Sequence, residues 1–151
     1  MPPAADGSPP ATVDVELSVD VAGRRRSAVA CVPSVSPPAS GWPVVLAFHG
    51  GQSHPRQMRG FSGLDDLAAA GAAVVVYPAG TGSREGILTW NGGNCCGDAF
   101  RSASDDVGFV AALVMSAPPV GIIVANTRFP ATNAILEVLI PMADVVVRGV
   151  R

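Results

Sequence analysis

The stretch Trp42–Gln52, WPVVLAFHGGQ, joins a continuous apolar run to the motif His49-Gly50-Gly51. The five consecutive apolar residues of Val44–Phe48 predict a strand that is buried on both faces, as in a parallel sheet. Glycines directly after such a strand let the backbone approach a ligand and leave N–H groups free to bind a negatively charged oxygen. We therefore expect an oxyanion-binding loop here, which needs a nucleophile from elsewhere in the chain.

The composition of the whole chain limits its class and its partners. Its 151 residues are enough for one domain with a core, and 48% hydrophobic and 15% charged residues are typical of a globular protein. A net charge of -2 argues against nucleic acid or an anionic membrane as a partner. The basic run Arg24–Arg26 is interpreted as a solvated shoulder of a hairpin. The chain shows neither a membrane span nor a signal peptide, and its localisation stays open.

The N-terminal third predicts an antiparallel hairpin. Residues 1–11 are rich in Pro and Ala and are interpreted as a flexible lead-in. Thr12–Val19 predicts a half-buried strand, and a turn then leads into a second strand at Arg25–Val32. The first strand places four apolar residues on one face: Val13, Val15, Leu17 and Val19.

The segment after the glycine motif predicts a strand-helix-strand unit. Apolar residues at helical spacing in Phe61–Ala70 predict a helix that ends at Gly71, and Ala72–Tyr77 predicts another buried strand. Such a crossover makes the two strands parallel, so the predicted fold class is α/β, with the hairpin preceding a parallel βαβ unit. Ligands of these sheets bind beyond the carboxyl ends of the strands, where His49–Gly51 and Tyr77 both fall.

The following segment predicts a loop and a capped helix. Gly80–Gly97 contains six glycines and is expected to be a long functional loop. Within it, Trp90 has two interpretations: an exposed ring that stacks on a sugar or an aromatic group, or a cover at the edge of the core. Ser104–Asp106 is predicted to open a helix through Val114, with Ser104 or Asp105 as its cap and the acidic residues at its positive end.

The chain has three cysteines and two histidines, so few residues could bind a metal or form a disulfide. A bond between the neighbours Cys95 and Cys96 would strain the peptide that joins them, so the sequence argues against it and leaves pairing with another segment open. Cys31 falls in a predicted strand. Zinc ligation by these two cysteines with His49 and His54 matches no common spacing, and we expect neither a metal nor a cofactor.

Four segments, taken in this order, resemble a known family. They are Val44–Ser53, Ala73–Pro78, Trp90–Gly97 with its Cys95-Cys96 pair, and Asp105–Phe109. Each is weak by itself, but the ordered set is similar to the N-terminal part of the polyhydroxybutyrate depolymerase and feruloyl esterase group of α/β-hydrolases. The resemblance covers roughly Val13–Val114.

This resemblance implies hydrolysis of carboxylic esters by a Ser-His-Asp triad through an acyl-serine. It implies that Gly50 and Gly51 form the oxyanion loop, and that His49 shapes this loop and is not the triad base. It also implies that Trp90 lies near the pocket for an acyl or aromatic group. Tyr77, at the end of the neighbouring strand, is a second candidate for substrate contact.

The remainder of the chain departs from that family. The sequence contains no G-x-S-x-G elbow, and both histidines, His49 and His54, come before the point where an elbow would fall. We interpret residues 115–151 as a divergent or frameshifted tail that follows an α/β-hydrolase portion at residues 12–114. Its predicted elements are a strand at Val120–Ala125, a short helix at Ala134–Leu139 and a strand at Asp144–Val147.

Three hypotheses for function stay open. The first is an esterase-lineage fragment that is inactive by itself and takes a missing C-terminal segment as its partner. Its sheet edge would be unpaired after two parallel strands, so the isolated chain is expected to aggregate or to need a partner. The second is a non-catalytic module that binds sugars or aromatic acids. The third is an atypical hydrolase that uses His54 with Ser53 or Ser62. A small ester, sugar or aromatic acid is the expected ligand in all three.

Overall fold

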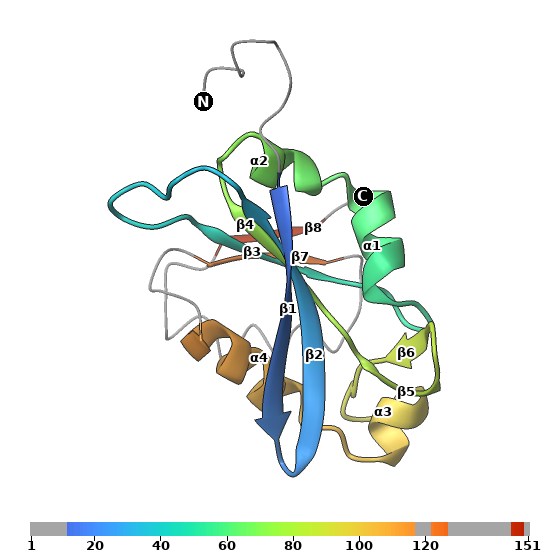
Figure 1. The fold of residues 1–151 in the computed structure, drawn as a ribbon. Coiled ribbons are helices and arrows are strands. Elements are labelled where there is room, and N and C mark those ends of the chain that lie inside the picture. Colours follow the sequence, from blue (N-terminus) through green and yellow to red (C-terminus); the bar gives the residue numbers. More distant parts are fainter. Residues whose placement is uncertain (1–11, 117–121, 127–145, 150–151) are drawn as a thin grey trace.

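One mixed sheet organises the computed structural model, which describes residues 12–116, 122–126 and 146–149. Its strands lie in the order β1-β2-β4-β3-β7-β8 (Figure 1). The first three strands of this order pair antiparallel, and β4, β3, β7 and β8 run parallel to one another. The bounds are Thr12–Val21 for β1, Arg24–Pro33 for β2, Val44–Phe48 for β3, Val74–Pro78 for β4, Ile122–Asn126 for β7 and Val146–Gly149 for β8. The predicted α/β class is confirmed.

The predicted hairpin of β1 and β2 is also confirmed, although β1 is buried along only part of its length. Leu17 and Val19 pack against the core, whereas Val13 and Val15 are 51% and 39% exposed. The alternation along the strand was predicted correctly. Its first half is exposed because β1 is the last strand of the described sheet on this side and the core cluster reaches only its second half.

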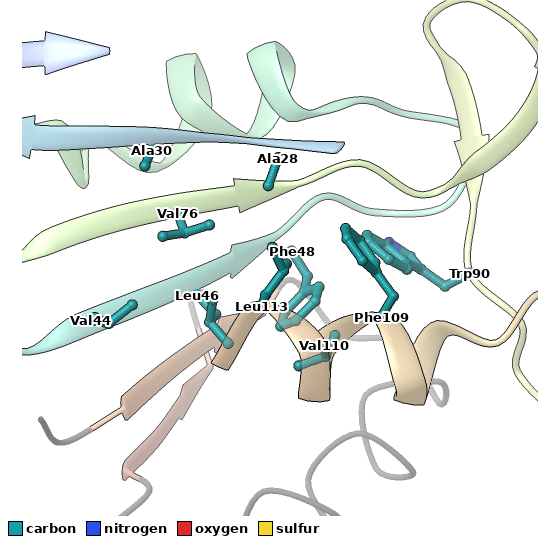
Figure 2. Packing of buried hydrophobic residues seen from close by; sticks show 10 residues of the cluster. All are labelled: Ala28, Ala30, Val44, Leu46, Phe48, Val76, Trp90, Phe109, Val110 and Leu113. Atoms are coloured by element: carbon teal, nitrogen blue, oxygen red, sulfur yellow. The ribbon is translucent and has the colours of Figure 1, made fainter. Parts of the chain in front are cut away.

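The central strand β3 is buried on both faces, and its residues alternate between two packed clusters. Val45 and Ala47 face a cluster that includes Met58 and Ala68, from the helices α1 (Pro55–Ser62) and α2 (Asp65–Ala69). The other face packs against the helix α4, which spans Asp106–Ser116. Figure 2 shows Phe109, Val110 and Leu113 of α4 pointing toward the strand residues Val44, Leu46 and Phe48. The sheet therefore lies between two helical layers.

The single helix predicted at Phe61–Ala70 is wrong: two helices occupy this region. Pro55 suits the first turn of α1 because its missing N–H would have no partner inside the helix. Gly63 ends α1 in the left-handed conformation at φ 64°, and Phe61 is 63% exposed. Gly71 follows α2 with φ 66°, as predicted for a helix end.

The long loop predicted at Gly80–Gly97 contains secondary structure. The strands β5 (Thr81–Arg84) and β6 (Ile87–Thr89) form a small antiparallel hairpin, and the helix α3 spans Gly97–Arg101. Leu88 of this hairpin is bridged to Ser53, which ties it to the segment after β3. The glycines that suggested an irregular loop instead allow close contacts between these short elements.

The tail adds two strands to the sheet. β7 pairs with β3 from Val44↔Ile122 to Phe48↔Asn126, and β8 pairs with β7. The strands predicted at Val120–Ala125 and Asp144–Val147 are confirmed with shifted ends, so the edge predicted beside β3 is paired. The lead-in at residues 1–11 and the helix predicted at Ala134–Leu139 lie outside the described residues. No helix within the described ranges is long and apolar enough to cross a bilayer.

Candidate functional site

His49 stands at the carboxyl end of β3 and fixes the loop that follows. Its Nε2 accepts a hydrogen bond from the Gly80 N–H at 3.0 Å, and its Nδ1 lies 2.8 Å from the Gly50 carbonyl oxygen. Because a backbone N–H can only donate, Nε2 carries no proton, and Nδ1–H donates to Gly50. The ring is 1% exposed, and burial lowers the pKa of His49, which keeps it neutral at pH 7.

The Gly50–Gly51 peptide is oriented by this contact. The peptide is trans, so its N–H points away from its carbonyl group. Because the Gly50 carbonyl points to His49, the Gly51 N–H points in the opposite direction. None of the hydrogen bonds among the described residues uses this N–H. Gly51 also lines the two cavities described below, so the group is available to an oxygen of a ligand.

Gly80 permits the close approach on which this arrangement depends. A Cβ at this position would lie 2.5 Å from the Thr89 carbonyl oxygen and 3.2 Å from His49 Nε2. Any side chain would therefore push the Gly80 N–H away from the ring. Gly80 is a residue that the sequence did not single out, and only its neighbours in space reveal its role.

Trp90 covers the core edge beside this loop. Its ring is 4% exposed, its Nε1–H donates to the His49 carbonyl oxygen at 2.9 Å, and it packs edge-on against Phe48 at 5.3 Å between ring centroids. Figure 2 shows the Trp90 ring at the end of the cluster, next to Phe48 and Phe109. Of the two interpretations, the structure has the buried one and not the exposed stacking surface. Contact with a substrate stays a prediction.

Tyr77 lies on the other side of the sheet, in the cluster beneath α1 and α2. The residue is 1% exposed, and its hydroxyl donates to Asp65 Oδ1 at 2.8 Å. Burial is the largest cause of the raised pKa of its hydroxyl, followed by the hydrogen bond to Asp65. These contacts tie the end of β4 to α2, and a substrate contact by Tyr77 stays a prediction.

Two cavities flank the glycine loop and share Gly51 and Gln52. The first, here called the α3 cavity, has a volume of about 420 Å³, and the second, the α1 cavity, about 350 Å³. The α3 cavity is lined by Gly51, Gln52, Ile87, Thr89, Cys96, Gly97, Asp98 and Arg101. The α1 cavity is lined by Gly50, Gly51, Gln52, Ser53, Gln57, Met58 and Phe61.

The lining of both cavities is close to neutral. Asp98 and Arg101 in the α3 cavity form an ion pair with each other, and Asp98 also accepts a hydrogen bond from the Ser83 N–H. Hydrogen bonds from Ser83, followed by the one from Arg101, lower the pKa of Asp98 to about 2. The residues that line the α1 cavity carry no formal charge. Neutral ligands are therefore favoured over ionic ones.

A buried ion pair between Arg26 and Asp106 joins the elements around the site, and it corrects one prediction. Arg26 was expected to be solvated, but it is 5% exposed and pairs with Asp106 at 2.7 Å. Asp106 also accepts a hydrogen bond from the Asn91 N–H at 2.6 Å, so β2, α4 and the loop after Trp90 meet at one carboxylate. The predicted helix cap is confirmed at Asp105, which accepts a hydrogen bond from the Gly108 N–H at 2.8 Å, and Asp106 lies in the first turn of α4. The sequence alone does not show which of the three consecutive arginines is buried.

The cysteines also differ from expectation. Cys95 and Cys96 form a disulfide with each other, against the sequence-based prediction, while Cys31 is a buried free thiol in β2. Burial is the main cause of the raised pKa of Cys31. Cys96 lines the α3 cavity, so the disulfide forms part of its wall. The described residues hold no cluster of three or more side chains that could bind a metal ion.

The hydroxyl groups of the two serines proposed to act with His54 form hydrogen bonds with other residues. The Ser53 hydroxyl donates to Gln57 Oε1 at 2.6 Å, and the Ser62 hydroxyl accepts from the Leu64 N–H at 3.3 Å. No hydrogen bond between the His54 ring and another described residue is present. Among the described residues neither serine forms a hydrogen bond with His54, and the third hypothesis stays a prediction.

Comparison with known proteins defines the fold. No protein-family model and no curated protein matches the sequence. The structure is similar to acetyl xylan esterase 1 from Thermoanaerobacterium sp. JW/SL YS485, with a TM-score of 0.54 and 20% identity over 84% of this chain and 44% of that one. It is also similar to a ferulic acid esterase of Anaeromyces mucronatus, solved with ferulic acid, with a TM-score of 0.54 and 12% identity over 91% of this chain and 55% of that one.

A third similar structure is brefeldin A esterase, described as a bacterial homologue of human hormone-sensitive lipase. Its TM-score is 0.53, with 16% identity over 93% of this chain and 38% of that one. The chain thus spans about half of the length of these esterases, or less. At these identities the comparison establishes the fold. The chain has part of an α/β-hydrolase fold, and the structures named here, together with a similar hydrolase from Agrobacterium vitis S4, are esterases and hydrolases.

Proposed function

We propose that this chain forms the oxyanion-binding part of a carboxylic ester hydrolase site, of the polyhydroxybutyrate depolymerase and feruloyl esterase type. In this proposal the Gly51 N–H donates to the carbonyl oxygen of a bound ester. The observation that carries it is the contact between His49 and Gly50, which turns the Gly51 N–H away from the core and leaves it without a partner among the described residues. The two nearly neutral cavities beside this group suit the two halves of an uncharged ester.

We also propose that the chain by itself binds esters without hydrolysing them. Both ring nitrogens of His49 are used in holding the loop, so this residue is not free to act as a base. The hydroxyl of Ser53 is bonded to Gln57 and not to an imidazole. An ester held at Gly51 thus has a hydrogen-bond donor for its carbonyl oxygen and lacks an activated nucleophile among the described residues.

Binding at the loop is tested by following backbone amides with NMR during titration with methyl butanoate. The matched control ligand is 1-methoxybutane, in which a methylene group replaces the carbonyl group. We expect a downfield shift of the Gly51 amide proton with the ester and none with the ether, because only the ester carries the carbonyl oxygen to which this N–H is proposed to donate. Equal shifts with both ligands, or none with the ester, would overturn the proposal.

Hydrolysis of p-nitrophenyl acetate tests the second part. We expect the rate of ester hydrolysis with the wild-type protein to equal the rate with the same concentration of the His54→Ala variant in the same buffer. Turnover that His54→Ala abolishes would show an active hydrolase and reject the proposal of a chain that binds without hydrolysing.

A further inference from the structure

Two residues line both cavities, Gly51 and Gln52, and of these Gln52 is the one that has a side chain. Its side chain is exposed and makes no hydrogen bond to another described residue. From these observations we infer that the Gln52 amide recognises a hydroxyl or carbonyl group carried by the ester close to its ester carbonyl. This inference rests on the proposed function, because it takes the Gly51 N–H as the point where that carbonyl binds.

The chemistry of the side chain defines what it can recognise. A primary amide offers two N–H donors and one carbonyl acceptor and carries no charge. It can therefore pair with a neutral hydroxyl or carbonyl group of a substrate. An amide at the junction of two cavities can form a hydrogen bond with such a group, whereas a hydrocarbon in the same place forms none.

The backbone of Gln52 gives a second reason to assign the role to its side chain. Gln52 has φ 58°, a left-handed conformation that glycine adopts freely and other residues adopt at a cost in strain. Glycine would therefore suit the backbone of this position better than glutamine does. Ala22 and Ala103 share this conformation, with φ 49° each, and neither lines the two cavities, so they serve as matched controls.

The experiment compares two esters of the same size and shape. Methyl 3-hydroxypropanoate and methyl butanoate differ only by a hydroxyl group in place of a terminal methyl group. Dissociation constants are measured from the shift of the Gly51 amide for the wild type and for Gln52→Ala, Gln52→Gly and Ala103→Gly. We expect the wild type and Ala103→Gly to bind the hydroxy ester roughly three- to tenfold tighter, and both Gln52 variants to bind the two esters equally.

A stability measurement separates recognition from a structural role. Relief of the left-handed strain should raise the urea midpoint of Gln52→Gly, as in Ala103→Gly, while ester selectivity is lost only in the Gln52 variant. A lower midpoint in Gln52→Gly would indicate that the side chain supports the fold and would overturn the inference. Selectivity that survives in Gln52→Ala would overturn it too and would leave the proposed function standing. Failure of both esters to shift the Gly51 amide would overturn the proposed function and this inference together.

Discussion

At the scale of single residues, His49 connects the sheet to the glycine loop through three separate contacts. Its ring accepts from Gly80 and donates to Gly50, and its carbonyl oxygen accepts from the Trp90 indole. Each of these groups is buried or half-buried, so losing its partner costs more than an exposed hydrogen bond would. His49 is therefore a structural residue whose position decides which way the Gly51 N–H points.

Replacing His49 with Phe keeps a ring in the core and removes both nitrogens. We expect the free energy of unfolding to fall by about 2–4 kcal/mol, because the Gly80 N–H and the Gly50 carbonyl each lose a buried partner. Urea denaturation measures this change. The matched control is His54→Phe, whose ring nitrogens bond to no described residue, and it should change stability by less than about 0.5 kcal/mol. A similar loss in both variants would contradict the assigned role of His49.

The pKa of His49 predicts how stability depends on pH. Burial lowers this pKa in the folded chain, so the unfolded chain binds the proton more tightly. The stability is therefore complete above about pH 6.5, the pKa of an unperturbed histidine, and falls as the pH drops below that value. Urea midpoints between pH 8 and pH 5 measure the effect. The dependence should persist in His54→Ala and be reduced in His49→Phe; an unchanged dependence in His49→Phe would assign it to other groups.

At the scale of elements, the Arg26–Asp106 ion pair joins strand β2 of the hairpin to helix α4. Arg26 also stacks over the Phe109 ring at 4.2 Å and donates to the Ser104 hydroxyl at 3.0 Å. Asp106 receives the Asn91 N–H in addition to the guanidinium group. The packing of β2, α4 and the loop after Trp90 against one another thus depends on one buried ion pair. The side chains of both partners are 4% exposed.

Replacing Arg26 with Met should lower the free energy of unfolding by about 3–5 kcal/mol, because Asp106 would keep a buried charge without its partner. The double variant Arg26→Met with Asp106→Leu should lose less than the sum of the two single variants, since it removes both charges. Urea denaturation of all three variants gives the coupling. Arg24→Met, at an exposed position, is the matched control, and additive losses in the double variant would contradict the coupling.

At the scale of the whole molecule, the described sheet ends at β1 on one side and at β8 on the other. The outer strand β1 carries the acidic residues Asp14, Glu16 and Asp20, a composition that discourages pairing with another chain. The sequence of β8, VVRG, has one charged residue, Arg148. The two end strands of the described sheet therefore differ in their number of charged residues.

We expect the isolated protein to self-associate through the β8 side. Sedimentation velocity should show a weight-average sedimentation coefficient that rises with protein concentration. Association that persists at high salt would fit strand pairing better than pairing of charges. A monomer at all concentrations that melts in one cooperative transition would contradict this expectation.

The strands were predictable because their signals are local. Val44–Phe48 and Ala72–Tyr77 are continuous apolar runs, and both form buried parallel strands. The helices after the glycine motif were harder, because Pro55 and Gly63 determine where they begin and end more strongly than the apolar spacing does. The β5–β6 hairpin has few apolar residues and forms against Ser53 and α3, so its sequence alone gives little sign of it.

The sequence by itself determined the α/β class, the position of the glycine loop after β3 and the lack of a G-x-S-x-G elbow, because these depend on local pattern and residue identity. Tertiary structure alone decided that Arg26 is buried and Arg24 exposed, that Trp90 packs inside, and that Gly80 supplies the N–H for His49. These facts depend on which residues meet across the sheet. Such contacts join positions far apart in the chain, and local pattern carries no record of them.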